Sequence, residues 1–432
     1  MARKHTHLPL RVLLNNAELG FLVKKPGGAI EFRYTEGWLR RKDAIPISLS
    51  MPLQEEPFRG DAVSAVFENL LPDSEPLRRR VAERVGARGT DACSLLSKIG
   101  RDCVGALQFV SEEVAVDTDT TRIEGEPVTA REIEAMLQNL AEAPLGMDRD
   151  RDFRISVAGA QEKTALLFHE GRWWRPRGTT PTTHILKKAM GKLRNGIDLS
   201  RSIENEFYCL RVLAAYGLPV NEAKMQTFGK TRALVVTRFD RRWTSDGRLL
   251  RLPQEDMCQA LSVPPTLKYQ SEGGPGMVDI LKLLKASNTP EQDIRLFLKA
   301  QVLFWLLGAT DGHAKNFSIF LGAGGQFQLT PFYDVLSAQP ARDAGQILKK
   351  EMKLAMAVGR QHYAMGYIEG RHFVQTAEKA GVPASLARDV LDDVAARAGQ
   401  AGEAVAGDLP RGFPGDIHES VQRGIRDRLG KI

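Results

Sequence analysis

The sequence lacks any apolar run that approaches the ~18 residues required by a membrane-spanning helix. Its first residues, Met-Ala-Arg-Lys-His-Thr-His, also lack the apolar stretch of a secretory signal. These absences argue against a membrane protein and against export. They predict a protein of the cytoplasm.

Cysteine is scarce. The 432 residues contain four cysteines, which are Cys93, Cys103, Cys209 and Cys258. No two of them have the spacing of a metal-binding pair. Because a protein without an export signal stays in a reducing compartment, we expect free thiols that pack as small side chains.

The spacing patterns of zinc fingers and helix-turn-helix motifs are missing, and no internal repeat is present. The formal net charge of +7 permits contacts with nucleic-acid phosphates, but it is weak support for DNA binding. Hydrophobic residues make up 43% and charged residues 26%, as in ordinary globular proteins. The chain is long enough for two or three domains.

What is present is a change of pattern along the chain. Residues 1–112 alternate in the manner of strands and then become helical, which predicts an N-terminal α/β subdomain. Residues 113–150 form a connection with one helix, opened by the capping box Thr129–Glu132. Residues 151–253 are rich in strand-like segments, and residues 254–432 are mostly helical. This order predicts the α+β class.

The segment Asp311-Gly-His313-Ala-Lys-Asn316 places an Asn five positions after an Asp, and Tyr333-Asp334 adds a second Asp downstream. Kinase catalytic loops use this set: the first Asp orients the nucleophilic hydroxyl, and the Asn and the later Asp bind Mg²⁺. Mg²⁺ favours oxygen ligands and needs one or two carboxylates beside the phosphates of ATP. The pattern therefore predicts phosphoryl transfer, with ATP and Mg²⁺ as cofactors and a bilobal, protein-kinase-like fold.

Each of these residues also has an ordinary structural interpretation. Asp311-Gly is a common turn, and Asp334 is able to cap a helix. A loop hydrogen bond is the usual role for His313, and solvation is the usual state of Lys315. The combination at kinase spacing favours Asp311 as the catalytic residue, with Asn316 and Asp334 as metal ligands.

A kinase also needs a Lys on a strand beside the phosphates and a helical Glu paired with it. Lys187 ends a strand-like segment, and Lys163 and Lys188 are its rivals. Glu206 follows on the apolar stripe of a helix, where a charge needs a partner. We expect an ion pair between Lys187 and Glu206, and we expect the neighbouring Glu204 to be solvated.

The small-residue sequence from Ser156 to Lys163 separates two strand-like segments, and we expect residues 153–157 and 164–168 to form a hairpin around it. Small side chains let backbone N–H groups approach phosphates, although a plain β-turn explains the sequence as well. Thr237-Arg238-Phe239 ends a strand where a chain joining two lobes would meet adenine. A simple strand end is the alternative.

Six motifs occur in order along the chain. They are Ile155-Ser-Val-Ala-Gly-Ala-Gln-Glu-Lys163, Thr183-His-Ile-Leu-Lys187, Arg238-Phe-Asp-Arg-Arg242, Leu252-Pro-Gln-Glu-Asp-Met-Cys258, Gly308-Ala-Thr-Asp-Gly-His-Ala-Lys-Asn316 and Leu329-Thr-Pro-Phe-Tyr-Asp-Val-Leu-Ser337. Together they resemble the HipA-type Ser/Thr kinases, which are the toxins of bacterial HipBA toxin–antitoxin modules. The similarity runs to about residue 375.

The resemblance implies a role for each motif. Asp311 would be the catalytic base, Asn316 and Asp334 would bind Mg²⁺, and Lys187 would contact the ATP phosphates. Ser156 would be an autophosphorylation site, whose phosphate expels the loop. The remaining ATP contacts would come from Val157, Ala158, Gly159, Ala160, Gln161, Glu162, Thr237, Arg238, Phe239, His313, Tyr333 and Asp334. Thr237 stands where related proteins carry an acid, so backbone groups would make the adenine contact.

The resemblance also implies partners. A HipB-type helix-turn-helix antitoxin would bind the chain and would make most of the contacts with operator DNA. The protein substrate would be glutamate–tRNA ligase, whose phosphorylation stops translation and induces antibiotic tolerance. The expected function is thus a self-inactivating Ser/Thr protein kinase toxin of the bacterial cytoplasm. The alternatives are a kinase-fold corepressor and a small-molecule phosphotransferase.

Overall fold

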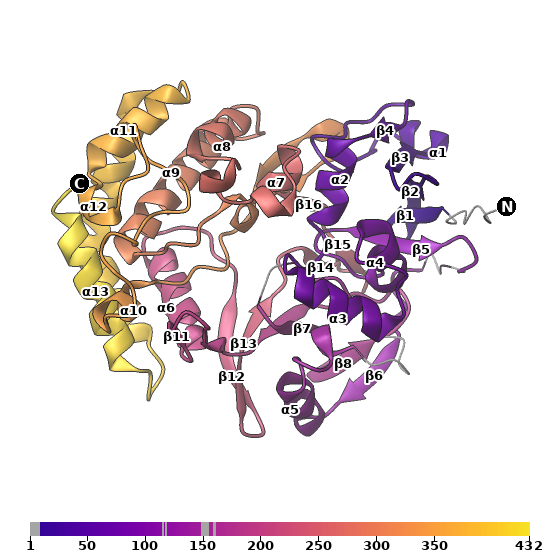
Figure 1. The fold of residues 1–432 in the computed structure, drawn as a ribbon, viewed down its shortest axis with the longest axis horizontal. Coiled ribbons are helices and arrows are strands. Elements are labelled where there is room, and N and C mark those ends of the chain that lie inside the picture. Colours follow the sequence, from indigo (N-terminus) through magenta and orange to yellow (C-terminus); the bar gives the residue numbers. More distant parts are fainter. Residues whose placement is uncertain (1–8, 115, 117–118, 148–154, 159–160) are drawn as a thin grey trace. The chain divides into compact units, whose positions relative to one another are not determined.

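The computed structural model describes residues 9–114, 116, 119–147, 155–158 and 161–432 (Figure 1). The chain divides into two compact units, each made of several stretches. Unit 1 comprises Met1–Lys188, Gln226–Thr266 and Ile319–Phe327, and unit 2 comprises Ala189–Met225, Leu267–Ser318 and Gln328–Ile432. Within the described ranges, no helix has the length and apolar character needed to span a bilayer.

The N-terminal part of unit 1 is an antiparallel sheet in the strand order β4-β3-β2-β1-β5. Its strands are β1 (Leu10–Leu14), β2 (Ala17–Lys24), β3 (Ile30–Tyr34), β4 (Phe58–Arg59) and β5 (Leu107–Ser111), and its helices are α1 (Glu36–Leu39), α2 (Asp61–Glu68), α3 (Glu75–Val85) and α4 (Ala92–Ile99). The buried rings of Phe32, Phe67 and Phe109 pack against one another in its core. Apolar burial therefore holds helix and sheet together.

A six-stranded sheet in the order β12-β13-β9-β7-β8-β6 forms most of the rest of unit 1. Its strands are β6 (Gly125–Val128), β7 (Lys163–His169), β8 (Arg172–Pro176), β9 (His184–Lys187), β12 (Ala223–Phe228) and β13 (Thr231–Thr237). Helix α5 (Ala130–Gln138) begins with the predicted capping box, in which Thr129 and Glu132 each bond the other's backbone N–H. That prediction is confirmed.

Short strands form three further small sheets. They are β10 (Gly191–Lys192) with β11 (Asp198–Leu199), β14 (Arg241–Trp243) with β15 (Leu249–Arg251), and β16 (Gln254–Asp256) with β17 (Ser318–Leu321) and β18 (Phe327–Leu329). Helix α7 (Met257–Ala260) follows β16 and is capped by Asp256 and Gln259.

Unit 2 is mostly helical. Its helices are α6 (Ser202–Ala215), α8 (Met277–Leu284), α9 (Pro290–Leu307), α10 (Gln339–Asp343), α11 (Gly370–Lys379), α12 (Ala384–Asp408) and α13 (Gly415–Leu429). α9 packs against α6, α8, α12 and α13, and its C-terminal half is buried on all sides (Figure 1). The apolar run from Ile294 to Leu307 forms most of this helix and is the centre of the unit.

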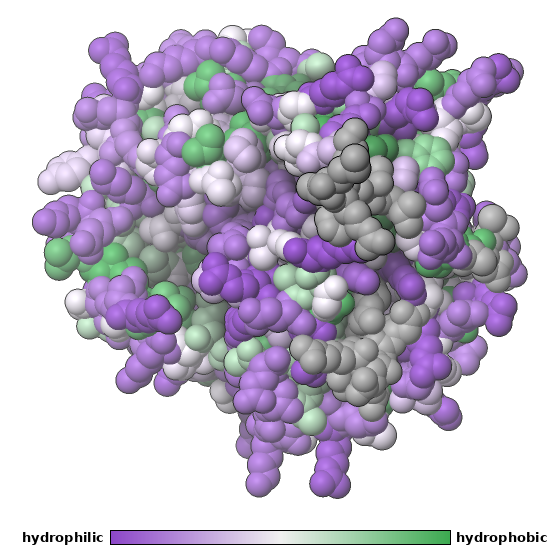
Figure 2. Space-filling view, turned by 45° about the vertical axis from the view of Figure 1, so that its right-hand side comes forward, coloured by the Kyte–Doolittle hydropathy of each residue, from purple (hydrophilic) through white to green (hydrophobic). Residues whose placement is uncertain are grey.

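The surface is largely polar. Figure 2 shows one face, on which hydrophilic side chains predominate and hydrophobic ones occur in small separate groups. Among the described residues, the large hydrophobic side chains that are exposed are Leu193, Trp243, Leu267, Leu348 and Tyr367. Scattered single residues of this kind need no functional explanation.

The sheets of unit 1 and the helices of unit 2 confirm the predicted α+β class. The strand predicted over residues 153–157 is wrong for its described part, because residues 155–158 have no strand partner and β7 pairs with β8 and β9. Ile155, Ser156 and Val157 are all buried, so their alternation does not mark a two-faced strand. The four-part division of the chain stays a prediction.

Candidate active site

The loop that carries Asp311 is mounted on α9. The helix ends at Gly308, whose φ of 71° turns the chain out of the helix. Gly312 then packs against the ring of Phe304, where a Cβ would come within 2.5 Å of a ring atom. The packing therefore requires a glycine at position 312, in addition to any turn that Asp311-Gly forms. The loop is supported by a rigid, buried helix.

Asp311 is exposed and holds the loop together through its carbonyl group. That carbonyl accepts hydrogen bonds from the His313 N–H at 2.9 Å and from Asn316 Nδ2 at 2.8 Å. The Asp311 carboxylate accepts a 2.6 Å hydrogen bond from the Tyr269 hydroxyl, and the Tyr269 ring packs edge-on against His313. The structure thus brings together three of the predicted site residues and adds Tyr269.

The orientation of Asn316 suits a cation. Because its amide nitrogen is used in the bond to Asp311, the amide oxygen Oδ1 is the atom that can act as a metal ligand. The next residue, Phe317, packs with Phe297, Phe304 and Phe332, whose ring centroids lie 5.1–6.2 Å from its own. Because Phe317 follows Asn316 directly, this aromatic packing restricts the position of the Asn316 backbone.

Tyr333 ties the segment of Asp334 to the loop. Its hydroxyl donates to the Lys315 carbonyl at 3.0 Å and lies 2.6 Å from Ser318 Oγ. Asp334 has φ of 58°, a left-handed conformation that is uncommon outside glycine and that concentrates at functional sites. The capping alternative for Asp334 is wrong, because the next helix, α10, has Ala338 as its N-cap.

Lys187 has a second Lys beside it. β9 pairs antiparallel with β7 in the register Lys163↔Lys187, and these side chains are 7% and 6% exposed. Like charges directly opposite each other in a sheet are unfavourable, and burial makes them more so. The two residues that the sequence treats as rivals are therefore neighbours in one basic spot.

The loop before β7 begins in a buried position. Ser156 is fully buried: its Oγ donates to the Leu70 carbonyl at 2.7 Å, and its N–H donates to the Asp102 carbonyl at 2.9 Å. Gln161 donates to the Lys188 carbonyl at 2.7 Å. The phosphate-covering role proposed for residues 157–162 stays a prediction, because Gly159 and Ala160 lie outside the described residues.

The segment 237–239 lies at the end of β13. Thr237 pairs with His184, and the ring of Phe239 packs edge-on against Phe320. The guanidinium group of Arg238 is buried and bonds Asp240 at 2.7 Å, so it points into the protein. An adenine contact by this segment would come from backbone groups, and it stays a prediction.

Helix α6 carries Glu206, the expected partner of Lys187, and its neighbour Glu204. Glu206 is 3% exposed, as expected for a charge on the apolar stripe. The expectation that Glu204 is solvated is wrong, since it is 8% exposed. α6 packs against α9, α12 and α13, so more than one face of the helix is covered. The ion pair between Lys187 and Glu206 stays a prediction.

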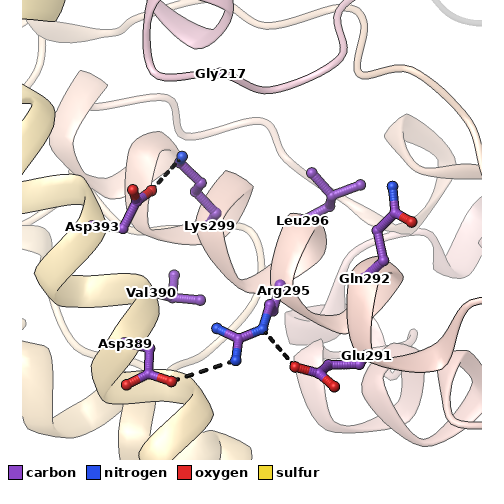
Figure 3. Close-up of a pocket in the computed structure, with 9 residues that line it drawn as sticks. All are labelled: Gly217, Glu291, Gln292, Arg295, Leu296, Lys299, Asp389, Val390 and Asp393. Carbon is purple, nitrogen blue, oxygen red and sulfur yellow. Dashed lines mark hydrogen bonds and ion pairs between the residues drawn. The ribbon is translucent and has the colours of Figure 1, made fainter.

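A pocket of about 610 Å³ lies in unit 2 along α9 and α12 (Figure 3). It is lined by Gly217, Glu291, Gln292, Arg295, Leu296, Lys299, Asp389, Val390 and Asp393. Arg295 bonds Glu291 at 3.0 Å and Asp389 at 3.4 Å, and Lys299 bonds Asp393 at 2.6 Å. Three carboxylates and two basic side chains line it, and none of the predicted site residues does.

Two family models match the chain. The model of the HipA N-terminal domain matches residues 10–110, and that of the HipA-like C-terminal domain matches residues 155–402. Together they include both the N-terminal sheet and every motif of the candidate site.

Individual relatives give the same result. Y4mE of Sinorhizobium fredii, named as a kinase, is 33% identical over 88% of this chain and 87% of its own length. The serine/threonine-protein kinase toxin HipA of Shewanella oneidensis is 28% identical over 85% of this chain and 82% of its own. The solved complex of Shewanella oneidensis HipA, HipB and operator DNA contains a chain with the same fold: the TM-score is 0.79, with 24% identity over 98% of this chain and 97% of that one.

Proposed function

The chain belongs to the HipA family, and on that premise we propose that it is a Ser/Thr protein kinase that uses ATP and Mg²⁺ and arrests growth as a toxin. One observation carries the proposal: the loop from Asp311 to Asn316 is bonded through Tyr333 to the segment of Asp334. This is the set of side chains that a kinase needs for its nucleophile and its metal.

The residues of the loop divide the chemistry among them. Asp311 Oδ1 accepts the Tyr269 hydroxyl, so Oδ2 is the oxygen that would orient the substrate hydroxyl and take its proton. Asn316 Oδ1 and the Asp334 carboxylate would hold Mg²⁺, which neutralises phosphate charge when it is bound. His313 and Tyr333 would line the nucleotide.

Residues outside the catalytic loop would hold the rest of the nucleotide. Lys187 and its cross-strand neighbour Lys163 would neutralise the phosphates, and Glu206 would pair with Lys187. Backbone N–H groups of residues 157–162 would cover the phosphates. Backbone groups of Thr237, Arg238 and Phe239 would contact adenine.

The partners follow from the relatives. The solved Shewanella oneidensis complex contains HipA, HipB and operator DNA. For this chain we propose a HipB-type antitoxin as partner, with operator DNA reached mainly through it. We further propose a cytoplasmic location in a bacterium, glutamate–tRNA ligase as the substrate, and inactivation by phosphorylation of Ser156.

Transfer of the γ-phosphate of ATP to bacterial proteins tests the proposal directly. We expect the wild type to label protein on Ser or Thr when Mg²⁺ is present. Asp311→Ala should lower labelling by a factor of about 10²–10⁴, which is the usual contribution of a positioned general base. Asp416→Ala is the matched control: it removes an exposed carboxylate whose surface ion pair with Arg201 contributes little.

Three outcomes would contradict the proposal in different ways. Equal labelling by wild type and Asp311→Ala would remove Asp311 from its role. Phosphorylation of an aminoglycoside without labelling of protein would indicate a small-molecule phosphotransferase. Binding of the antitoxin and operator DNA without any phosphoryl transfer would indicate a corepressor.

A further inference from the structure

Five fully buried charged side chains meet in unit 1, away from the residues assigned to phosphate or metal. They are Asp102, Asp240, Arg238, Arg241 and Arg251, each at most 5% exposed, and we call them the Asp102 cluster. Asp102 lies between α4 and β5 in the N-terminal sheet domain, whereas the other four come from residues 238–251. The cluster therefore joins two distant parts of the sequence.

The Asp102 carboxylate is the centre of this arrangement. One oxygen, Oδ1, accepts from Arg241 Nη2 at 2.9 Å and from Arg251 Nε at 3.0 Å. The other, Oδ2, accepts from the N–H and the hydroxyl of Thr182 at 3.0 and 2.7 Å and from Arg238 Nη1 at 3.4 Å. Both oxygens are saturated with donors, so the carboxylate has one position.

The backbone around Asp102 extends the network to Arg238. Arg238 Nη2 donates to the Cys103 carbonyl at 2.8 Å and to Asp240 at 2.7 Å, and Arg238 Nε donates to Asp240 at 3.0 Å. The Gly105 N–H donates to Asp240 at 2.7 Å, and the Gly105 carbonyl accepts from Arg241. Residues 102–105 thus form hydrogen bonds with both ends of the segment 238–241.

The charges of the cluster are held in the ionised state. Burial by itself would raise the pKa of Asp102, but the charges of Arg241, Arg251 and Arg238 lower it well below its usual range. Burial and repulsion from Arg238 lower the pKa of Arg241 to about 10, still above neutrality. Two carboxylates face three guanidinium groups, which leaves a net charge of +1. Loss of either carboxylate would leave a larger uncompensated charge in the interior.

Two segments of the candidate site are held in place by hydrogen bonds with residues of this cluster. The first is residues 237–239, since Arg238 is itself a member and its N–H donates to the Thr183 carbonyl at 2.8 Å. The second is the start of the segment from Ser156 to Lys163, which contains the residues proposed to cover the phosphates. The Asp102 carbonyl accepts a hydrogen bond from the Ser156 N–H in this segment. A buried group that bonds both segments fixes their backbones relative to each other.

We propose that Asp102 is a positioning residue for nucleotide binding: through Arg238 and Thr182, the N-terminal domain sets the backbone of residues 237–239 that reads the adenine ring. The inference rests on the proposed kinase function and adds that the N-terminal domain is part of the nucleotide site. Base recognition by backbone groups depends on their position to a fraction of an ångström. Displacing this segment should therefore weaken ATP binding and blur the distinction between ATP and GTP.

Steady-state kinetics of the full chain with ATP and with GTP test this proposal. Asp102→Asn should raise KM for ATP about tenfold, lower the preference for ATP over GTP by a similar factor, and leave kcat per folded molecule within about twofold. Thr182→Val keeps every charge. It should raise KM for ATP and lower the preference for ATP over GTP, each by about threefold. Glu68→Gln is the control: it breaks an ion pair with Arg78 in the same N-terminal domain but does not touch the cluster.

A double variant separates positioning from stability. Asp102→Asn with Arg251→Met removes one charge of each sign, so the net charge of the cluster stays +1. We expect the melting temperature to recover relative to Asp102→Asn while the ATP preference stays low. Recovery of both would show a structural role only and would overturn the proposal, as would unchanged ATP preference in Asp102→Asn and Thr182→Val. If the wild type binds neither nucleotide, the proposed function fails first and this inference fails with it.

Discussion

Glu255 is a carboxyl group that the fold keeps out of water. It lies on β16, is 1% exposed, and accepts a 2.8 Å hydrogen bond from the Leu49 N–H. Burial raises the pKa of Glu255 to about 8, against the lowering effect of the bonds from Leu49 and Ser48. Because the native pKa exceeds the unfolded value, the stability linked to this proton is complete below about pH 4.5 and is lost as the pH rises through 8.

Glu255→Gln should remove this dependence, because Gln resembles the protonated acid. The free energy of unfolding of the variant should equal that of the wild type near pH 5 and exceed it by roughly 2–5 kcal/mol above pH 8. Denaturant unfolding at pH 5–9 measures this. Glu31→Gln is the control. The hydrogen bond from Arg59 lowers the pKa of Glu31, so this carboxylate stays ionised throughout pH 5–9. The plot of unfolding free energy against pH for Glu31→Gln should therefore run parallel to that of the wild type. If the plot for Glu255→Gln also ran parallel to that of the wild type, the raised pKa of Glu255 would be contradicted.

Single residues were predictable where a motif fixes both type and spacing. Asp311 and Asn316 stand at kinase spacing, and the structure bonds them to each other. Tyr269 was not predictable: it lies 42 residues before Asp311 in an irregular segment without a motif, and only the folded chain brings its hydroxyl to the carboxylate. Glu204 was mispredicted because helical periodicity does not reveal how many neighbours cover a helix.

At the scale of elements, the proposed autophosphorylation concerns the segment from Ser156 to Lys163, for which we propose the phosphate-covering role. Ser156 sits in it with its hydroxyl bonded to the Leu70 carbonyl. Because Ser156 is fully buried, transfer of a phosphate to its hydroxyl requires the segment to leave this position. The structure therefore describes a form in which this serine is inaccessible.

Ser156→Ala should abolish autophosphorylation while retaining binding of an ATP analogue, because the backbone bond to Asp102 is unchanged. Mass spectrometry after incubation with Mg-ATP and titration with a fluorescent analogue measure the two properties. Ser97→Ala serves as the control, since the Ser97 hydroxyl also donates to a backbone carbonyl at 2.8 Å and lies in the same unit. A phosphorylated species that persists in Ser156→Ala would refute the assignment.

Long elements with clear periodicity and end signals were predictable. α9 follows from its apolar run and from Gly308, and α5 follows from its capping box. The strand expected over residues 153–157 failed in its described part, residues 155–157, because alternation also arises where both faces are buried. Pairing register, such as Lys163 opposite Lys187, was beyond the sequence because it depends on which strands become neighbours.

At the scale of the whole molecule, the α+β class and the HipA family were both predictable, since the motifs are long and ordered. The Asp102 cluster was not predictable. Its partners Asp102 and Arg241 lie 139 residues apart, and isolated charged residues carry no periodicity that would pair them. The sequence names the residues of a kinase site but not the buried groups that support them.

A structure of the chain with Mg²⁺ and a non-hydrolysable ATP analogue tests the central claim most directly. The account predicts a cation bonded to Asn316 Oδ1 and the Asp334 carboxylate, with Lys187 on the phosphates and Asp311 beside the γ-phosphate. A nucleotide bound elsewhere, or a cation that neither Asn316 nor Asp334 touches, would contradict it.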